Sequence, residues 1–181
     1  MGAFGYCRYC LEPGRSQRRQ RQAGRAALPV PRRPGKREVT RVDFYIAGAG
    51  GERDWLNVAC RVIEKAWRRE HDIYVHTDNA EAMAQFDNLL WSFRPNSFIP
   101  HRNEAVQAAA GTPREVLIGC SGQPGDHHDV LINLTHSKPD FFGRFTRIAE
   151  IVPGDEQARR RSRERYKYYR ERGYPLHVHD L

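Results

Sequence analysis

From residue 42 onward, the hydrophobic positions of the chain follow two alternating patterns. Short apolar runs between turn residues predict buried strands, and apolar residues three and four positions apart predict amphipathic helices. The predicted strands cover residues 42–46, 73–76, 98–99, 116–120, 130–134, 145–152 and 176–179. Helices are expected before the second, third and seventh of these strands. This alternation predicts an α/β fold: a single-domain, doubly wound, mostly parallel sheet with helices on both faces and a nucleotide-binding-like topology.

The first two helices are predicted from their apolar faces and their capping residues. Residues 55–69 carry apolar side chains at helical spacing, and Asn79 or Asp78 can cap the second helix. The buried face of the second helix is expected to comprise Ala82, Met83, Phe86, Leu89 and Leu90.

The third helix is expected within residues 153–175 and is strongly basic. Between Arg159 and Arg172 it has eight basic residues, and its acids there are Glu164 and Glu171. At 100° per residue, a helix places four of the cations within about 80° of one another, with Tyr166 at the edge of their stripe. These four are Arg159, Arg163, Lys167 and Arg170. Stacked like charges repel unless an anion lies over them, which predicts a site for an acidic peptide or a phosphate backbone.

The opposite face of this helix is expected to point inward through Ala158, Ser162 and Tyr169. A charged helix face is often simply solvated, but acids able to form i,i+4 pairs are scarce after Glu156. Val152 ends the preceding strand and should form an apolar notch beside the cations. An acidic peptide with a hydrophobic end fits such a site better than phosphate, because its last side chain fills the notch.

The net charge of +8 is confined to the first part of the chain. Residues 1–38 contain ten Arg and Lys and two acids, whereas residues 39–181 contain twenty of each sign. The neutral body argues against a general DNA-binding surface, which is usually basic. We expect a disordered basic arm at 1–38 and a folded domain at 39–181. Either the arm binds nucleic acid, or Val39 is the true start of translation and the arm is absent from the native protein.

The cysteines and histidines give little sign of a metal or a catalytic centre. Cys7 and Cys10 have the spacing of half a zinc site, but no second pair follows. Cys60 and Cys120 are expected to be buried free thiols. The two histidine groups, at 127–129 and 177–180, have the sequence of exposed polar segments. We therefore expect no cofactor, no metal and no intrinsic enzyme activity.

No run of apolar residues reaches the ~18 that a membrane span needs, and the start lacks the apolar segment of a signal peptide. A cytoplasmic location is expected.

The segment from Gly48 to Gly51 is the one feature that suggests a nucleotide-binding enzyme. It follows the first strand and precedes a helix, where a phosphate-binding loop would lie. It lacks the third glycine of GxGxxG and a GK[ST] ending, so a tight turn is the simpler interpretation. The alternative function is therefore an enzyme that binds a nucleotide at this loop.

Residues 90–101, LWSFRPNSFIPH, combine aromatic side chains with an arginine and prolines. Aromatic residues and arginine are enriched in interface cores. We expect Trp91, Phe98 and Pro100 to form a protein interface. For Phe93, a place in that interface and a role in closing the end of the sheet both remain open.

Four motifs of the domain resemble the chi subunit of bacterial DNA polymerase III: VDFYIAG, LLWSFRPNSFIPH, DVLINL and RERYKYYRERGY. The resemblance covers residues 39–181. It implies a nucleotide-free α/β fold and a non-catalytic replication accessory subunit in the bacterial cytoplasm. It also implies two partners, with DNA reached only indirectly: a small clamp-loader subunit, psi, and the acidic C-terminal tail of single-stranded-DNA-binding protein.

The resemblance also implies which residues contact each partner. By its motifs, the tail-binding surface would comprise Val152, Arg159, Arg163, Tyr166 and Lys167. The psi-binding surface would comprise Trp91, Phe98, Ile99, Pro100 and His101. Arg159 stands where a lysine is common in the family, which keeps the charge but changes the donor geometry. The arm has no counterpart in the family, and the loop at 47–51 is short.

Overall fold

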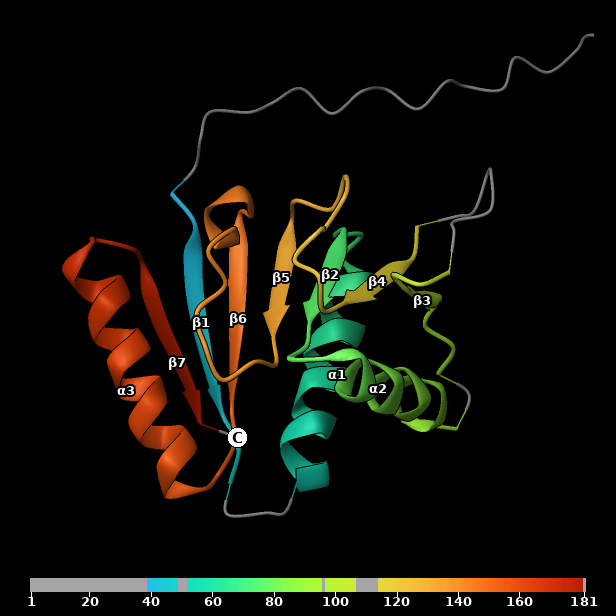
Figure 1. The fold of residues 1–181 in the computed structure, drawn as a ribbon, viewed down its shortest axis with the longest axis horizontal. Coiled ribbons are helices and arrows are strands. Elements are labelled where there is room, and N and C mark those ends of the chain that lie inside the picture. The colour runs from blue at the N-terminus through green and yellow to red at the C-terminus, as the bar shows by residue number, and fades with distance from the viewer. Residues whose placement is uncertain (1–38, 49–51, 96, 107–113, 181) are drawn as a thin grey trace, which may run out of the picture. The chain divides into compact units, whose positions relative to one another are not determined.

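The computed structural model describes residues 39–48, 52–95, 97–106 and 114–180. Seven strands form one sheet in the order β3-β4-β2-β5-β6-β1-β7, and all neighbouring strands are parallel (Figure 1). The strands are β1 (Arg41–Ile46), β2 (Ile73–His76), β3 (His101–Asn103), β4 (Val116–Gly119), β5 (Val130–Asn133), β6 (Arg147–Val152) and β7 (Leu176–Asp180). The predicted doubly wound α/β fold is confirmed.

Three α-helices connect these strands at the predicted places. They are α1 (Glu52–Arg68), α2 (Ala80–Ser92) and α3 (Glu156–Glu171), and a short 3₁₀ helix, η1 (Phe142–Arg144), precedes β6. Asn79 caps α2 through its side chain, which accepts a hydrogen bond from the backbone N–H of Ala82. Figure 1 shows α3 beside β7, whereas α1 and α2 lie towards the other end of the sheet.

Alternation of side chains along the strands divides the core between the two faces of the sheet. One core cluster joins α1 and α2 to strand residues such as Tyr45, Val75 and Ile151. The second joins α3 and η1 to Phe44, Tyr74 and other residues of the opposite parity. Helices therefore cover both faces, as the sequence predicts.

The prediction of a strand at residues 98–99 is wrong. Pairing with β4 begins at His101, which lies opposite Val116. Pro100 has no N–H to donate to a strand ladder, although its carbonyl accepts a hydrogen bond from the Val116 N–H at 2.8 Å. The strand therefore begins only after this proline, at His101.

The two described cysteines differ in their surroundings. Cys60 is a buried free thiol, as predicted, and burial raises its pKa to about 12. Cys120 is also free, but it follows the end of β4 and is only half-buried. The prediction of a buried thiol is thus wrong for Cys120, because the strand ends at Gly119.

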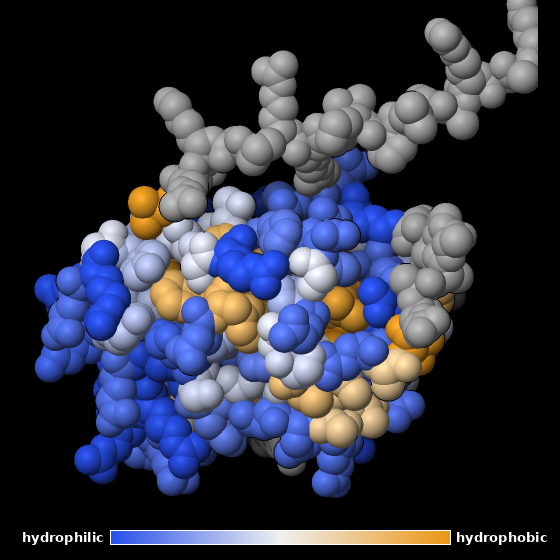
Figure 2. All heavy atoms as spheres, turned by 45° about the horizontal axis from the view of Figure 1, so that its top comes forward, coloured by the Kyte–Doolittle hydropathy of each residue, from blue (hydrophilic) through white to orange (hydrophobic). Residues whose placement is uncertain are grey.

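The face at the amino ends of the strands is mainly hydrophilic, and its apolar atoms form small areas among polar side chains (Figure 2). Within the described ranges, no helix is long and apolar enough to span a bilayer.

Candidate functional site

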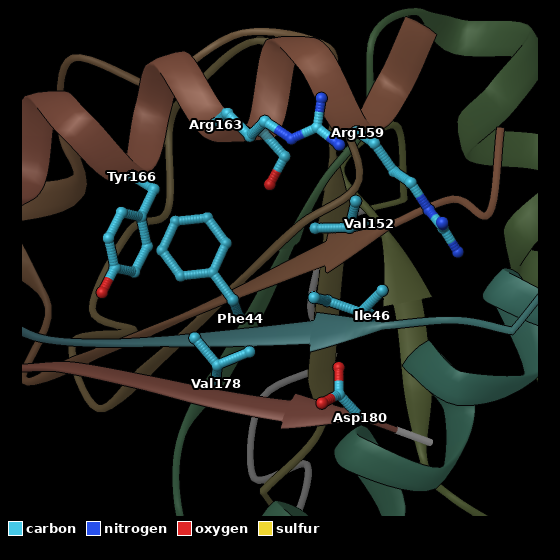
Figure 3. Close-up of a pocket in the computed structure, with 9 residues that line it drawn as sticks. Phe44, Ile46, Val152, Arg159, Arg163, Tyr166, Val178 and Asp180 are labelled. Carbon is cyan, nitrogen blue, oxygen red and sulfur yellow. The ribbon is translucent and has the colours of Figure 1, made fainter. Parts of the chain in front are cut away.

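A pocket of about 380 Å³ lies between α3 and the carboxyl ends of β1, β6 and β7 (Figure 3). Its apolar walls comprise Phe44, Ile46, Val152, Tyr166 and Val178. Its polar lining comprises Arg159, Ser162, Arg163 and Asp180. Parallel α/β sheets commonly bind their ligands at the carboxyl ends of the strands. This pocket is therefore our candidate binding site.

The register of the three strands sets the floor of the pocket. Val152 of β6 lies opposite Ile46 of β1, and Ile46 in turn lies opposite Asp180 of β7. Residues in register on parallel strands point to the same side of the sheet, so these three side chains form one row. The row is apolar except at its β7 end.

The position of α3 follows from its buried face and its cap. Asp155 ends the preceding turn, and its side chain accepts a hydrogen bond of 2.8 Å from the Ala158 N–H. The buried face comprises Ala158, Ser162, Arg165 and Tyr169, which confirms the three inward residues predicted from sequence and adds an arginine. Tyr166, at the edge of that face, packs its ring 5.5 Å from the ring of Phe44.

A buried polar network holds α3 against the sheet. Glu150 of β6 is fully buried and lies 3.1 Å from the Arg165 guanidinium. It also accepts hydrogen bonds of 2.9 Å from the Tyr169 hydroxyl and from the Asn133 amide. Burial raises the pKa of Glu150, and the charge of Arg165 opposes that rise, as do the hydrogen bonds. Arg165 also donates a hydrogen bond to the carbonyl of His136, so it links α3 both to β6 and to the loop that follows β5.

The cations of α3 are not equally free to meet a ligand. Arg163 forms an exposed ion pair with Glu156 at 3.1 Å, and Lys167 forms one with Glu171 at 3.8 Å. Acids that can form i,i+4 pairs are scarce in this helix, as the sequence indicates, but Glu171 forms one with Lys167, and Glu156 reaches Arg163 from seven residues away. Arg159 has no ion pair within the described part of the chain, and its buried Nε atom has no hydrogen-bond partner there. Arg159 is thus the lining cation best placed to bind the carboxylate of an external ligand.

The structure brings together most of the residues that the resemblance assigns to tail binding. Val152, Arg159, Arg163 and Tyr166 all line the pocket, whereas Lys167 lies on the exposed surface of α3 and outside the lining. The lining residues that sequence reasoning missed are Phe44, Ile46, Ser162, Val178 and Asp180. Most of these come from β1 and β7, and a sequence does not reveal that these strands lie beside β6.

A second surface is formed by the aromatic side chains that follow α2. Trp91 is 55% exposed and Phe98 is 65% exposed, and their ring centroids are 5.5 Å apart. Pro100, two residues after Phe98, is half-buried. Ile99 instead belongs to the core at 3% exposure, so its side chain is not available to a partner.

His101 packs against this aromatic surface, whereas Phe93 packs against the core. The side chain of His101 is 1% exposed, and its ring lies 4.6 Å from that of Trp91. Phe93 packs against the core, which favours a role in closing the end of the sheet. Of the residues that the resemblance assigns to psi, Trp91 and Phe98 therefore carry most of the exposed apolar surface.

Several other sequence features have ordinary structural roles or lie outside the description. Ala49–Gly51 of the glycine loop, Cys7, Cys10 and the rest of the 1–38 arm lie outside the described residues. His179 lies 3.1 Å from the buried carboxylate of Asp43. Burial opposes ionisation of Asp43, but the hydrogen bonds from Arg41 and His179 and the charges of Arg147 and Arg41 together outweigh it and lower the pKa. In the described ranges, no group of three or more potential metal ligands is close enough to hold an ion.

The fold and the pocket define an α/β protein with an apolar, arginine-flanked pocket at the carboxyl edge of its sheet. The sequence model of the DNA polymerase III chi subunit matches residues 39–177. The chain belongs to the DNA polymerase III chi-subunit family and is a replication accessory subunit.

Three relatives show how far the similarity extends. The chain is 41% identical to the chi subunit of Pseudomonas aeruginosa over 143 residues, which cover 79% of this chain and 98% of the relative. It is 31% identical to the Haemophilus influenzae chi subunit, over 76% of this chain and 95% of the relative. It is 28% identical to that of Escherichia coli, over 75% and 94% respectively.

Proposed function

We propose that the pocket binds the acidic C-terminal tail of single-stranded-DNA-binding protein. The observation that carries this proposal is the presence, in one pocket, of apolar walls and an arginine, Arg159, that has no ion pair among the described residues. A peptide that ends in a hydrophobic residue can place that side chain against Val152, Ile46 and Tyr166. Its carboxylates then reach Arg159 and, after exchange with Glu156, Arg163.

The same features predict a weak, salt-sensitive contact. Burying one large apolar side chain contributes about 1.5–3 kcal/mol, and each exposed ion pair adds only about 0–1 kcal/mol. Salt screens exposed charges, so affinity should fall as ionic strength rises. Such a contact suits a non-catalytic subunit that links the polymerase III clamp-loader complex to coated single-stranded DNA in the bacterial cytoplasm.

Titration calorimetry with the acidic tail peptide tests this function. Arg159→Ala and Arg163→Ala should each weaken binding, by up to about fivefold if the lost ion pair is worth about 1 kcal/mol. Lys167→Glu, which reverses a charge beside the pocket, should also weaken it. Arg144→Ala removes an exposed arginine from η1, outside the pocket lining, and should bind like the wild type. Unchanged affinity in the Arg159 and Arg163 variants, with intact circular dichroism spectra, would refute the assignment of the site.

For the aromatic surface, we propose contact with the psi subunit of the clamp loader where that subunit is present. The supporting observation is the pair of neighbouring exposed rings, Trp91 and Phe98. Large aromatic residues are the commonest hot spots of protein interfaces. Trp91→Ala should weaken binding to purified psi by at least about tenfold, which corresponds to about 1.4 kcal/mol. Equal binding by the variant and the wild type would place the interface elsewhere.

The alternative function, a nucleotide-binding enzyme, has no comparable support in the described residues. A thermal-shift screen of the full chain separates the two: the tail peptide should raise the melting temperature and nucleotides should not.

A further inference from the structure

The binding pocket has an acidic side as well as a basic side. Asp180, at the end of β7, lines the pocket across from Arg159 and Arg163 of α3 (Figure 3). It occupies the β7 end of the row in which Val152 and Ile46 form the apolar part. An aspartate in this row is unexpected in a site for an acidic ligand, because it adds a charge of the same sign as the ligand's.

The arrangement of charges gives the pocket a direction. Arg159 lies in the first turns of α3, where the helix dipole adds positive potential. Asp180 adds negative potential on the side of the pocket formed by β7. Among the described residues it forms no ion pair. A bound carboxylate is therefore favoured near the start of α3 and disfavoured near the end of β7.

We infer that Asp180 is a specificity residue that orients the bound peptide and selects an uncharged last side chain. This inference rests on the proposed function of the pocket. The peptide carboxylates face Arg159, and the last side chain lies over the row from Val152 to Asp180. A peptide whose last residue is itself acidic would bring a second carboxylate next to Asp180, so the pocket binds it less tightly.

The size of this discrimination follows from Coulomb's law. Two like charges about 6 Å apart, in surroundings with an effective dielectric constant of about 40–80, change an equilibrium constant by about three- to tenfold. Replacing Asp180 by asparagine removes one of these charges with little change of shape. The main effect of Asp180→Asn should therefore be on the peptide with an acidic end, because its last side chain lies nearest.

The experiment compares two synthetic peptides, four aspartates followed by phenylalanine and four aspartates followed by glutamate. Affinities for the full chain are measured by fluorescence anisotropy at low salt. Asp180→Asn should reduce the preference for the phenylalanine peptide by about three- to tenfold. The matched control is Asp126→Asn, which removes the same charge from an exposed position in the β4–β5 loop outside the pocket lining. This control should leave the preference unchanged.

Each other outcome identifies which statement is wrong. If the wild type binds the phenylalanine peptide and the preference is the same in Asp180→Asn, Asp180 has no role in specificity and the proposed function stands. An equal change in Asp126→Asn would assign the effect to net charge and also overturn the inference. If the wild type binds neither peptide, the proposed function fails and this inference fails with it.

Discussion

Replacing Arg165 by methionine should make the stability of the domain fall steeply as pH rises. The arginine faces Glu150, a carboxyl group with no solvent exposure, at 3.1 Å. Methionine has a similar length and packs well in apolar surroundings. The substitution removes the opposing charge but leaves the hydrogen bonds from Tyr169 and Asn133 to the carboxyl group.

The magnitude and the sign follow from the burial of Glu150. Removing one partner of a buried ion pair destabilises a protein by about 3–5 kcal/mol near neutral pH. Burial already raises the pKa of Glu150, and losing Arg165 raises it further. The folded variant therefore holds a proton that the unfolded chain releases above the ordinary glutamate pKa of about 4.3. Stability is retained at low pH and is lost as pH rises towards the folded pKa, by up to about 1.4 kcal/mol per pH unit.

Urea unfolding at pH 5, 6 and 7, followed by circular dichroism, measures this effect. The control is Arg160→Met, which removes an exposed arginine from the same helix and should change stability little at any pH. In the double variant Arg165→Met with Glu150→Met, the added pH dependence should disappear, because no buried carboxyl group remains. A destabilisation of Arg165→Met that is equal at all three pH values would show that ionisation of Glu150 does not set the stability of the variant.

Three further predictions concern the two surfaces and the helix cap. Ile99→Ala should lower the free energy of unfolding by about 2–5 kcal/mol, whereas the neighbouring Phe98→Ala should change it by less than about 0.5 kcal/mol, both measured by urea unfolding. Asp155→Ala should cost about 1 kcal/mol in the same assay and weaken tail-peptide binding, because the cap fixes the start of α3 beside the pocket. Trp91→Ala should leave the calorimetric affinity for the tail peptide unchanged; a loss of affinity would show that the two surfaces are coupled.

The sequence predicts the fold well because the strands of this sheet are short apolar runs separated by clear turn signals. Of the seven strands predicted from the sequence, all except the one at residues 98–99 overlap a strand of the structure. The exception arises because Pro100 interrupts an apolar segment, so an exposed aromatic, Phe98, and a core residue, Ile99, look alike in sequence.

The site is only partly readable from the sequence, for two physical reasons. Helical periodicity places Arg159, Arg163 and Tyr166 on one stripe, because neighbours on a helix are fixed by local geometry. The partners of that stripe come from β1 and β7, and strand order is a long-range property that local patterns do not contain. Periodicity also does not distinguish a free cation from one paired with an acid seven residues away, as Arg163 is with Glu156.

The sheet order separates the two surfaces that we propose as docking sites. The pocket is built on β6, β1 and β7 at one edge, and the aromatic surface lies next to β3 at the other. With about 4.8 Å between neighbouring strands, the two edge strands are roughly 29 Å apart, which is several Debye lengths at physiological salt. Charges at one edge are therefore screened from the other, and sites that share no contacts act additively. If both proposals hold, docking surfaces at opposite edges of the sheet would let the domain hold two proteins together without a conformational change.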